Sequence, residues 1–155
     1  MMLTEEEIRQ IQDEVAKSQN RRAACIEALR LVQSHHGWIS DERLQQVAAL
    51  LGMTAAELDG VATFYNLIFR QPVGRHVILI CNSVTCWIKG YVSLLDHLRD
   101  RLGIDFGQTT ADGRFTLLPI VCLGACDRAP AMMVDGERHD ELTPEKINAI
   151  LAHYE

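Results

Sequence analysis

The segment HVILICNSVTC, residues 76–86, determines the fold class that we expect for the second half of this 155-residue chain. Residues 76–80 form a short apolar run, bounded by the turn-forming segment QPVG at residues 71–74 and by Cys81. A run of this length between such boundaries is typical of a buried strand. We therefore expect a strand that ends where the first cysteine of the segment begins.

After this strand, the sequence predicts a helix and then a second strand. Residues 87–102 are predicted to form an amphipathic helix, because apolar side chains recur at helical spacing. Its apolar face is formed by Ile88, Val92, Leu95, Leu98 and Leu102. A second apolar run, residues 115–121, follows an Asp-Gly turn and predicts another strand. A helical connection between two neighbouring strands favours a parallel pair.

The remaining residues predict a hairpin and a final helix. Asp135-Gly136 separates two short arms, residues 131–134 and 137–140, and Asp-Gly is a strong hairpin signal. Thr143 is then expected to cap a helix that begins with a proline. The order strand, helix, strand, hairpin, helix predicts an α/β domain in which helices flank a mixed sheet.

The first half of the chain carries helical start signals instead. Capping boxes, in which a Thr precedes a Glu by three positions, mark helix starts at Thr4 and Thr54, and Ser40 is expected to cap a further helix. We therefore expect two domains, a helical bundle over residues 1–70 and the α/β domain over residues 75–155.

Composition and charge argue against several classes of function. The 48% hydrophobic content is enough for a globular core, whereas the net charge of −6 argues against a nucleic-acid partner. No apolar run approaches the roughly 20 residues that span a bilayer. The acidic start, residues 4–7, lacks the basic and then apolar pattern of a secretory signal. We expect a cytoplasmic chain without direct membrane insertion.

Five cysteines in a reducing compartment indicate a metal site more than disulfides. Cys81 and Cys86 follow the first predicted strand, and Cys122 and Cys126 follow the second. If the two strands are parallel, both loops emerge at the same edge of the sheet, and four thiolates converge on one metal site. Cys25 lies on the apolar face of a predicted helix, where core packing is the favoured interpretation.

The spacing of the cysteines leaves the metal open. Structural zinc sites have two to four residues between paired cysteines, and the gaps here are four and three. Zinc is therefore an alternative to an iron–sulfur cluster. Thiol–disulfide exchange is a third interpretation, although neither pair has the two-residue gap of a thioredoxin motif. The sequence contains neither a Gly-rich dinucleotide loop nor a P-loop, so an electron carrier is favoured over a nucleotide-binding enzyme.

Several motifs together resemble one known family. They are RRAA at residues 21–24, GVATFY at 60–65, RQPVGRH at 70–76, GRFTLLP at 113–119, and the cysteine segments CNSVTC at 81–86 and CLGAC at 122–126. With these motifs the chain resembles the small [2Fe–2S] subunits of respiratory complex I, the NADH:quinone oxidoreductase. Related subunits occur in NAD-linked hydrogenases and formate dehydrogenases.

The resemblance implies a thioredoxin-like ferredoxin domain behind the helical domain. It implies one [2Fe–2S] cluster on Cys81, Cys86, Cys122 and Cys126, and an electron-transfer role without catalytic residues of its own. The implied partner is the flavoprotein subunit that binds FMN and NADH, where hydride transfer takes place, together with the rest of the peripheral arm. The implied location is the cytoplasmic side of the inner membrane.

Side chains beside the cysteines could modify such a site. Trp87 follows Cys86 directly, and core packing is favoured for it over shielding of the metal from water. Asp127 would make reduction of a cluster harder, whereas Arg128 and Lys89 would make it easier.

Overall fold

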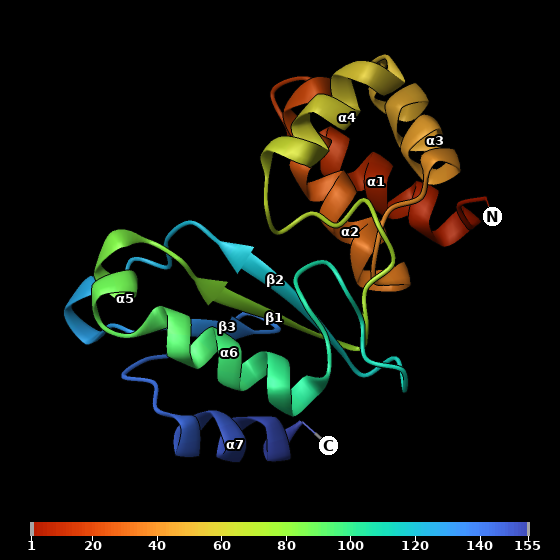
Figure 1. The fold of residues 1–155 in the computed structure, drawn as a ribbon. Coiled ribbons are helices and arrows are strands. Elements are labelled where there is room, and N and C mark those ends of the chain that lie inside the picture. The colour runs from red at the N-terminus through yellow and green to blue at the C-terminus, as the bar shows by residue number, and fades with distance from the viewer. Residues whose placement is uncertain (1, 155) are drawn as a thin grey trace. The chain divides into compact units, whose positions relative to one another are not determined.

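The structure, a computed structural model, describes residues 2–154 and divides into two compact units after Pro72 (Figure 1). The helical unit comprises residues 2–72, and the α/β unit comprises residues 73–154. Among these residues no single helix is both long and apolar enough to cross a membrane. The helices α3 (Asp41–Leu51) and α4 (Ala55–Phe64) meet those criteria only as a pair, which bends by 111° between them.

In the helical unit, α-helices begin directly after the three predicted cap residues. It contains α1 (Glu5–Lys17), η1 (Arg21–Ala24), α2 (Cys25–His36), α3 and α4. The side chains of Thr4, Ser40 and Thr54 each accept a backbone hydrogen bond from the third residue of the helix that follows, and both expected capping boxes are present. These bonds satisfy N–H groups that a helix start otherwise leaves unpaired. The expected bundle is confirmed.

One apolar core holds these helices together. Its fully buried members include Ile11, Leu29, Ile39, Leu51 and Leu58. Cys25 is half-buried and packs against this core, in agreement with its interpretation as a packing residue.

Arg70 fastens the segment after α4 to the same unit. Its Nε donates to Asp59 at 2.7 Å, and its Nη2 donates to Asp41 at 2.6 Å. The N–H of Ile39 also donates to the carbonyl oxygen of Phe69 at 2.9 Å. These hydrogen bonds hold residues 69–70 against the helical unit.

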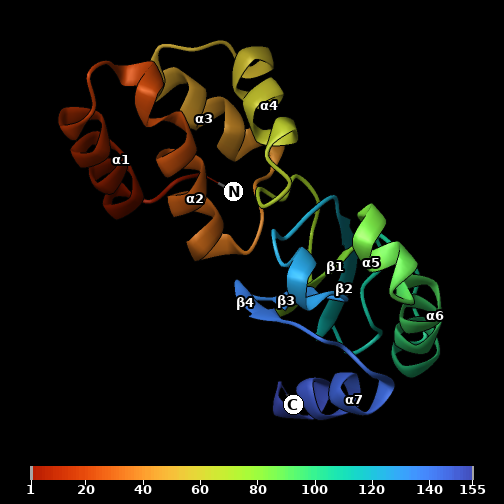
Figure 2. The same cartoon turned by 90° about the vertical axis from the view of Figure 1, so that its left-hand side faces the viewer.

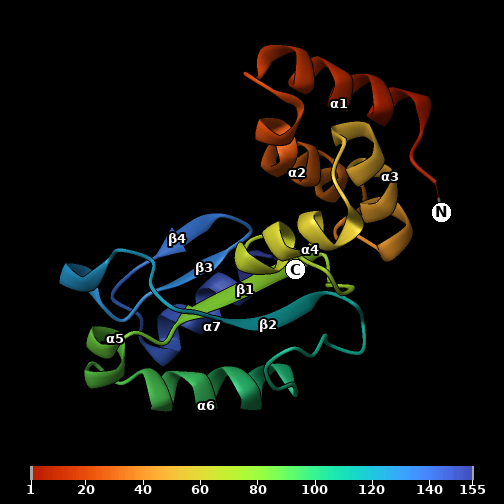
Figure 3. The same ribbon diagram turned by 90° about the horizontal axis from the view of Figure 1, so that it is seen from above.

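The α/β unit is built on a four-stranded mixed sheet. Its strands are β1 (His76–Cys81), β2 (Phe115–Ile120), β3 (Met132–Val134) and β4 (Glu137–His139). Their order is β2-β1-β3-β4, which Figure 3 shows from above. β1 pairs with β2 in parallel, and β3 is antiparallel to both β1 and β4. The parallel pair and the hairpin are as predicted.

Three α-helices belong to this unit: α5 (Val84–Ile88), α6 (Tyr91–Leu102) and α7 (Pro144–His153). The side chain of Thr143 accepts a hydrogen bond from the N–H of Lys146, so the predicted cap of the last helix is confirmed. α6 and α7 lie next to each other in Figures 1 and 2, and His97 Nε2 of α6 lies 3.0 Å from Asn148 Oδ1 of α7.

The predicted continuous helix over residues 87–102 is wrong. Gly90 separates α5 from α6 with a φ of 103°, a left-handed conformation that glycine adopts without a clash of Cβ. Because the helix breaks there, its apolar face does not continue across the junction. Ile88, which we expected in the core, lies before the break and is 76% exposed. Val92, also expected there, is 48% exposed because the buried face of α6 runs through Tyr91 and Leu94. Leu95 and Leu98 are buried as expected.

Candidate metal centre

The sheet brings both cysteine loops to one edge. Cys81 is the last residue of β1 and lies opposite Ile120, the last residue of β2, in the parallel register. Cys122 therefore follows two residues beyond the partner of Cys81. Figure 1 shows α5, which contains Cys86, beyond the carboxyl ends of β1 and β2. Cys126 begins the short helix η2 (Cys126–Arg128) in the loop that follows β2.

The four thiols differ in burial. Cys81 and Cys86 are 3% and 2% exposed, whereas Cys122 and Cys126 are exposed. The backbone N–H of Gly124 donates to the Cys122 sulfur at 3.3 Å. Gly124 itself has a left-handed backbone conformation, with a φ of 72°, which glycine adopts without a clash of Cβ. One pair is thus enclosed, and the other lies at the surface.

The surroundings of Cys86 suppress ionisation of its thiol. Burial, followed by a hydrogen bond with Cys81, raises the pKa of Cys86 to about 11, while a hydrogen bond from the Ala131 backbone acts in the opposite direction. The charge of Cys126 also contributes to the rise. A nucleophilic cysteine needs a lowered pKa. The environment of Cys86 therefore argues against thiol–disulfide exchange at this residue.

Two of the other predicted ligands influence Cys86. Cys81 and Cys126 both act on Cys86, whereas the Cys122 sulfur is bonded by the N–H of Gly124. Within residues 2–154 no group of three or more His, Cys, Asp or Glu side chains is arranged to hold a metal ion. The assignment of all four cysteines to one metal stays a prediction. The donor set nevertheless fits a [2Fe–2S] cluster, which takes four thiolates with N–H groups near the sulfurs.

The surroundings of the cysteines correct one expectation. Trp87 is 60% exposed, so its interpretation as a core residue is wrong. The positive charge of Arg128 is engaged by acidic side chains, with its Nη1 and Nη2 each 3.6 Å from an oxygen of Asp140 and Glu141, respectively. Sequence reasoning missed Asp140, because no local pattern shows that a carboxylate twelve positions downstream returns to the cysteine loop.

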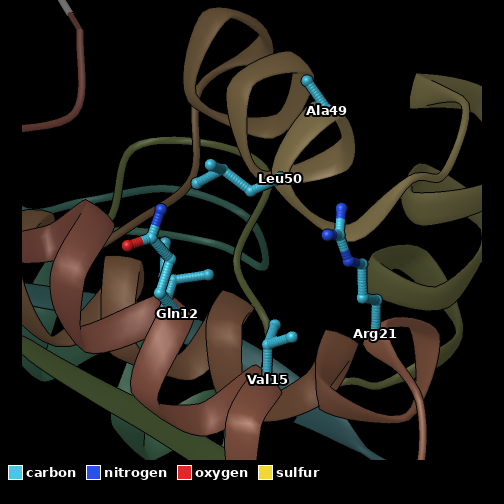
Figure 4. Close-up of a pocket in the computed structure, with 6 residues that line it drawn as sticks. Gln12, Val15, Arg21, Ala49 and Leu50 are labelled. Atoms are coloured by element: carbon cyan, nitrogen blue, oxygen red, sulfur yellow. The ribbon is translucent and has the colours of Figure 1, made fainter.

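The helical unit has a cavity of its own. It measures about 340 Å³ and is lined by Ile11, Gln12, Val15, Arg21, Ala49 and Leu50. Figure 4 shows these side chains around the opening between α1, α3 and the start of η1. None of them is a metal ligand of the type that the sequence predicted, so this cavity is separate from the cysteine site.

Comparison with known proteins assigns the family. The sequence model for "Thioredoxin-like [2Fe-2S] ferredoxin" matches residues 11–155. The chain belongs to the thioredoxin-like [2Fe–2S] ferredoxin family. Among relatives of this ferredoxin, the E subunit of NADH-quinone oxidoreductase from Pseudomonas aeruginosa is 47% identical over 99% of this chain and 92% of its own length. The E subunit from Escherichia coli K12 is 51% identical over 93% of this chain and 87% of its own. The resemblance stated from the motifs is confirmed.

Solved structures agree with this ferredoxin fold. An NAD⁺-reducing [NiFe]-hydrogenase in the H₂-reduced state contains a chain that matches 81% of this ferredoxin at 25% identity, with a TM-score of 0.69. This ferredoxin spans about a fifth of the length of that hydrogenase chain, since 22% of it is covered. The expected α/β architecture with a mixed sheet and flanking helices is confirmed.

Proposed function

We propose that this chain is the electron-transferring [2Fe–2S] subunit of an NADH:quinone oxidoreductase. The observation that carries the proposal is the similarity to the E subunits of two NADH-quinone oxidoreductases, at 47% and 51% identity over nearly the whole chain. Because both relatives are subunits of an oxidoreductase complex, we assign this chain to such a complex as well. The identity to the hydrogenase chain is lower, at 25%. The comparison therefore favours a complex I subunit over a hydrogenase subunit.

The ligands that we assign to the cluster are Cys81, Cys86, Cys122 and Cys126. In support, Cys81 and Cys86 are enclosed at the end of β1, and the loop with Cys122 and Cys126 follows β2 at the same edge. Cys25 belongs to the core of the helical unit and is not part of this set. The subunit is thus a carrier, without a catalytic residue of its own.

The protein contributes an environment for one-electron transfer. When bound, a [2Fe–2S] cluster accepts and releases one electron at a time. The Gly124 N–H donates to one cysteine sulfur, which stabilises negative charge there. The burial of Cys81 and Cys86 excludes water on one side, and the exposure of Cys122 and Cys126 leaves the other side open to a redox partner.

Exposed apolar side chains near the cysteine segments favour the docking of a partner. They are 48–76% exposed, and we name this set the apolar rim: Val84, Trp87, Ile88, Val92 and Val121. Val84, Trp87 and Ile88 lie on α5, which contains Cys86, and Val121 lies beside Cys122. Apolar patches of this kind commonly mark protein interfaces. We infer that the rim contacts the FMN- and NADH-binding flavoprotein subunit, within a peripheral arm on the cytoplasmic side of the membrane.

The deciding measurement is an EPR spectrum of the dithionite-reduced full chain, purified without air, with iron, sulfide and zinc analysis. An S = 1/2 signal with about two irons and two sulfides per chain supports the proposal. If the chain contained one zinc ion and gave no EPR signal, the proposal would be wrong and the metal would have a structural role.

Two matched variants test the ligand assignment. Cys122→Ala should abolish retention of the cluster, whereas Cys25→Ala should keep the visible spectrum of the wild type. An unchanged spectrum in Cys122→Ala would contradict the assignment of this residue.

A further inference from the structure

Asp140 is a buried carboxylate next to the second cysteine loop. It follows β4 directly, and its side chain is 7% exposed. Its Oδ1 lies 3.0 Å from Nε of Arg138, and its Oδ2 lies 3.6 Å from Nη1 of Arg128. Two arginines from different segments therefore meet on one carboxylate that water barely reaches.

Arg128 connects this carboxylate to the cysteine loop. It is the last residue of η2, the helix that begins at Cys126. Its N–H donates to the carbonyl oxygen of Ala125 at 3.0 Å, and its own carbonyl oxygen accepts from the N–H of Glu141 at 2.7 Å. Through these bonds the loop with Cys126 and the segment after β4 hold each other in place.

Arg138 approaches the same carboxylate from a different element. It lies on β4, which pairs with β3, whereas β1 carries Cys81 on the far side of β3. Removal of either arginine takes one positive charge from Asp140, but only Arg128 belongs to the helix that contains a predicted ligand. The two residues are thus a matched pair for separating a local charge effect from general stability.

We propose that Asp140 sets the reduction potential of the cluster by neutralising Arg128, and that it acts as a positioning residue for the Cys126 loop. The inference rests on the proposed function, because it presupposes a cluster on these cysteines. Reduction adds one negative charge to the cluster. A nearby unpaired cation favours that charge, and an unpaired anion opposes it. Burial of Asp140 reduces screening by water and salt.

The signs of the expected effects follow from this pairing. Asp140→Asn removes a buried negative charge and leaves Arg128 paired only with the exposed Glu141, so the reduction potential should rise. Arg128→Gln removes a positive charge beside the cysteine loop and leaves Asp140 paired with Arg138 alone, so the potential should fall. The double variant removes both charges and should return the potential toward that of the wild type.

The experiment is a potentiometric titration, followed by EPR, of the full chain purified anaerobically with its cluster. The wild type, the two single variants and the double variant form one cycle, and Arg128→Lys should restore the wild-type potential because it keeps the charge. Arg138→Gln is the matched control and should shift the potential less than Arg128→Gln. Because Arg128 is half exposed, its variants test the inference even if Asp140→Asn does not fold.

Opposite shifts in the single variants, with cancellation in the double variant, would support the pairing. Shifts of the same sign, no shift, or equal shifts for Arg128→Gln and Arg138→Gln would overturn it. A purely structural contact would release the cluster from both single variants without opposed shifts, which would also overturn it. Absence of an EPR signal from the wild type would instead refute the proposed function, so the two failures are distinguishable.

Discussion

Nε2 of His36, at the end of α2, lies 2.6 Å from Oε1 of Glu7, in the first turn of α1. The Glu7 side chain is 2% exposed, and its other oxygen accepts hydrogen bonds from the backbone and side chain of Thr4. Burial opposes ionisation of this carboxyl, but the hydrogen bonds from Thr4 and His36 outweigh it and lower the pKa of Glu7. One carboxylate therefore caps one helix and ties it to another.

Glu7→Gln should destabilise the helical unit by about 2 kcal/mol at pH 7, because it breaks a cap and a buried pair. Since the folded pKa lies below the ordinary value of 4.5, the ionised carboxylate stabilises above that pH. This contribution is lost as the pH falls through the lower, folded pKa. Urea denaturation gives the free energy of unfolding of both proteins at pH 7 and in acid. The difference between the wild type and Glu7→Gln should become smaller as the pH is lowered.

Fluorescence of Trp38 reports on this unit when Trp87 is replaced by Phe in both proteins. The matched control is Glu57→Gln, which alters the second capping box at an exposed carboxylate. It should cost less stability than Glu7→Gln. Equal losses, or a gap that does not change with pH, would contradict the role assigned to burial of the Glu7 pair.

Alkylation of the cluster-free chain should follow exposure and pKa. Iodoacetamide at neutral pH should modify Cys122 and Cys126 first, because both are exposed. Cys86 should react last, since it is buried and its pKa is raised to about 11. Peptide mapping by mass spectrometry gives the order. If Cys86 were modified as fast as Cys122, its thiol would be activated. That result would favour the interpretation as an enzyme of thiol–disulfide exchange.

Two glycines should respond to alanine in opposite directions. A Cβ on Gly74 would lie 2.9 Å from the Arg114 carbonyl oxygen, so Gly74→Ala should destabilise the α/β unit by about 1–3 kcal/mol. Gly60 lies inside α4 with open space at the Cβ position, so Gly60→Ala should stabilise the helical unit by about 0.5–1 kcal/mol. Thermal unfolding followed by circular dichroism checks both signs. A neutral Gly74→Ala would show that the backbone there can yield.

Ile88→Glu should weaken docking without affecting the cluster. Ile88 is 76% exposed in the apolar rim, so a charge there costs the isolated chain little but must be desolvated in an interface. Affinity for the purified flavoprotein subunit should fall at least about tenfold, with an unchanged EPR spectrum. The control is Arg101→Gln, which changes the net charge by the same amount at an exposed site near the C-terminal end of α6. Unaltered affinity in Ile88→Glu would place the interface elsewhere.

Local chemistry made much of this fold predictable. The caps at Thr4, Ser40 and Thr54 and the Asp135-Gly136 turn were all expected from residue types. Each depends on hydrogen bonds or backbone angles within a few positions, so no distant part of the chain can easily override it. The parallel pairing of β1 and β2, and with it the shared edge for the cysteine loops, followed from one helical connection.

Which side chains face the core, and which charges meet, depended on long-range contacts. Apolar spacing could not show that the helix breaks at Gly90, and the orientation of Ile88 depends on that break. Val92 lies within α6, but outside the face that packs on the core. The contact of Arg128 with Asp140 exists because the β3–β4 hairpin returns the chain to the loop after β2. Most of the elements, and the family, could be predicted from the sequence alone, since both follow from short-range patterns. The environment of each cysteine arises from contacts between distant segments, which only the folded chain creates.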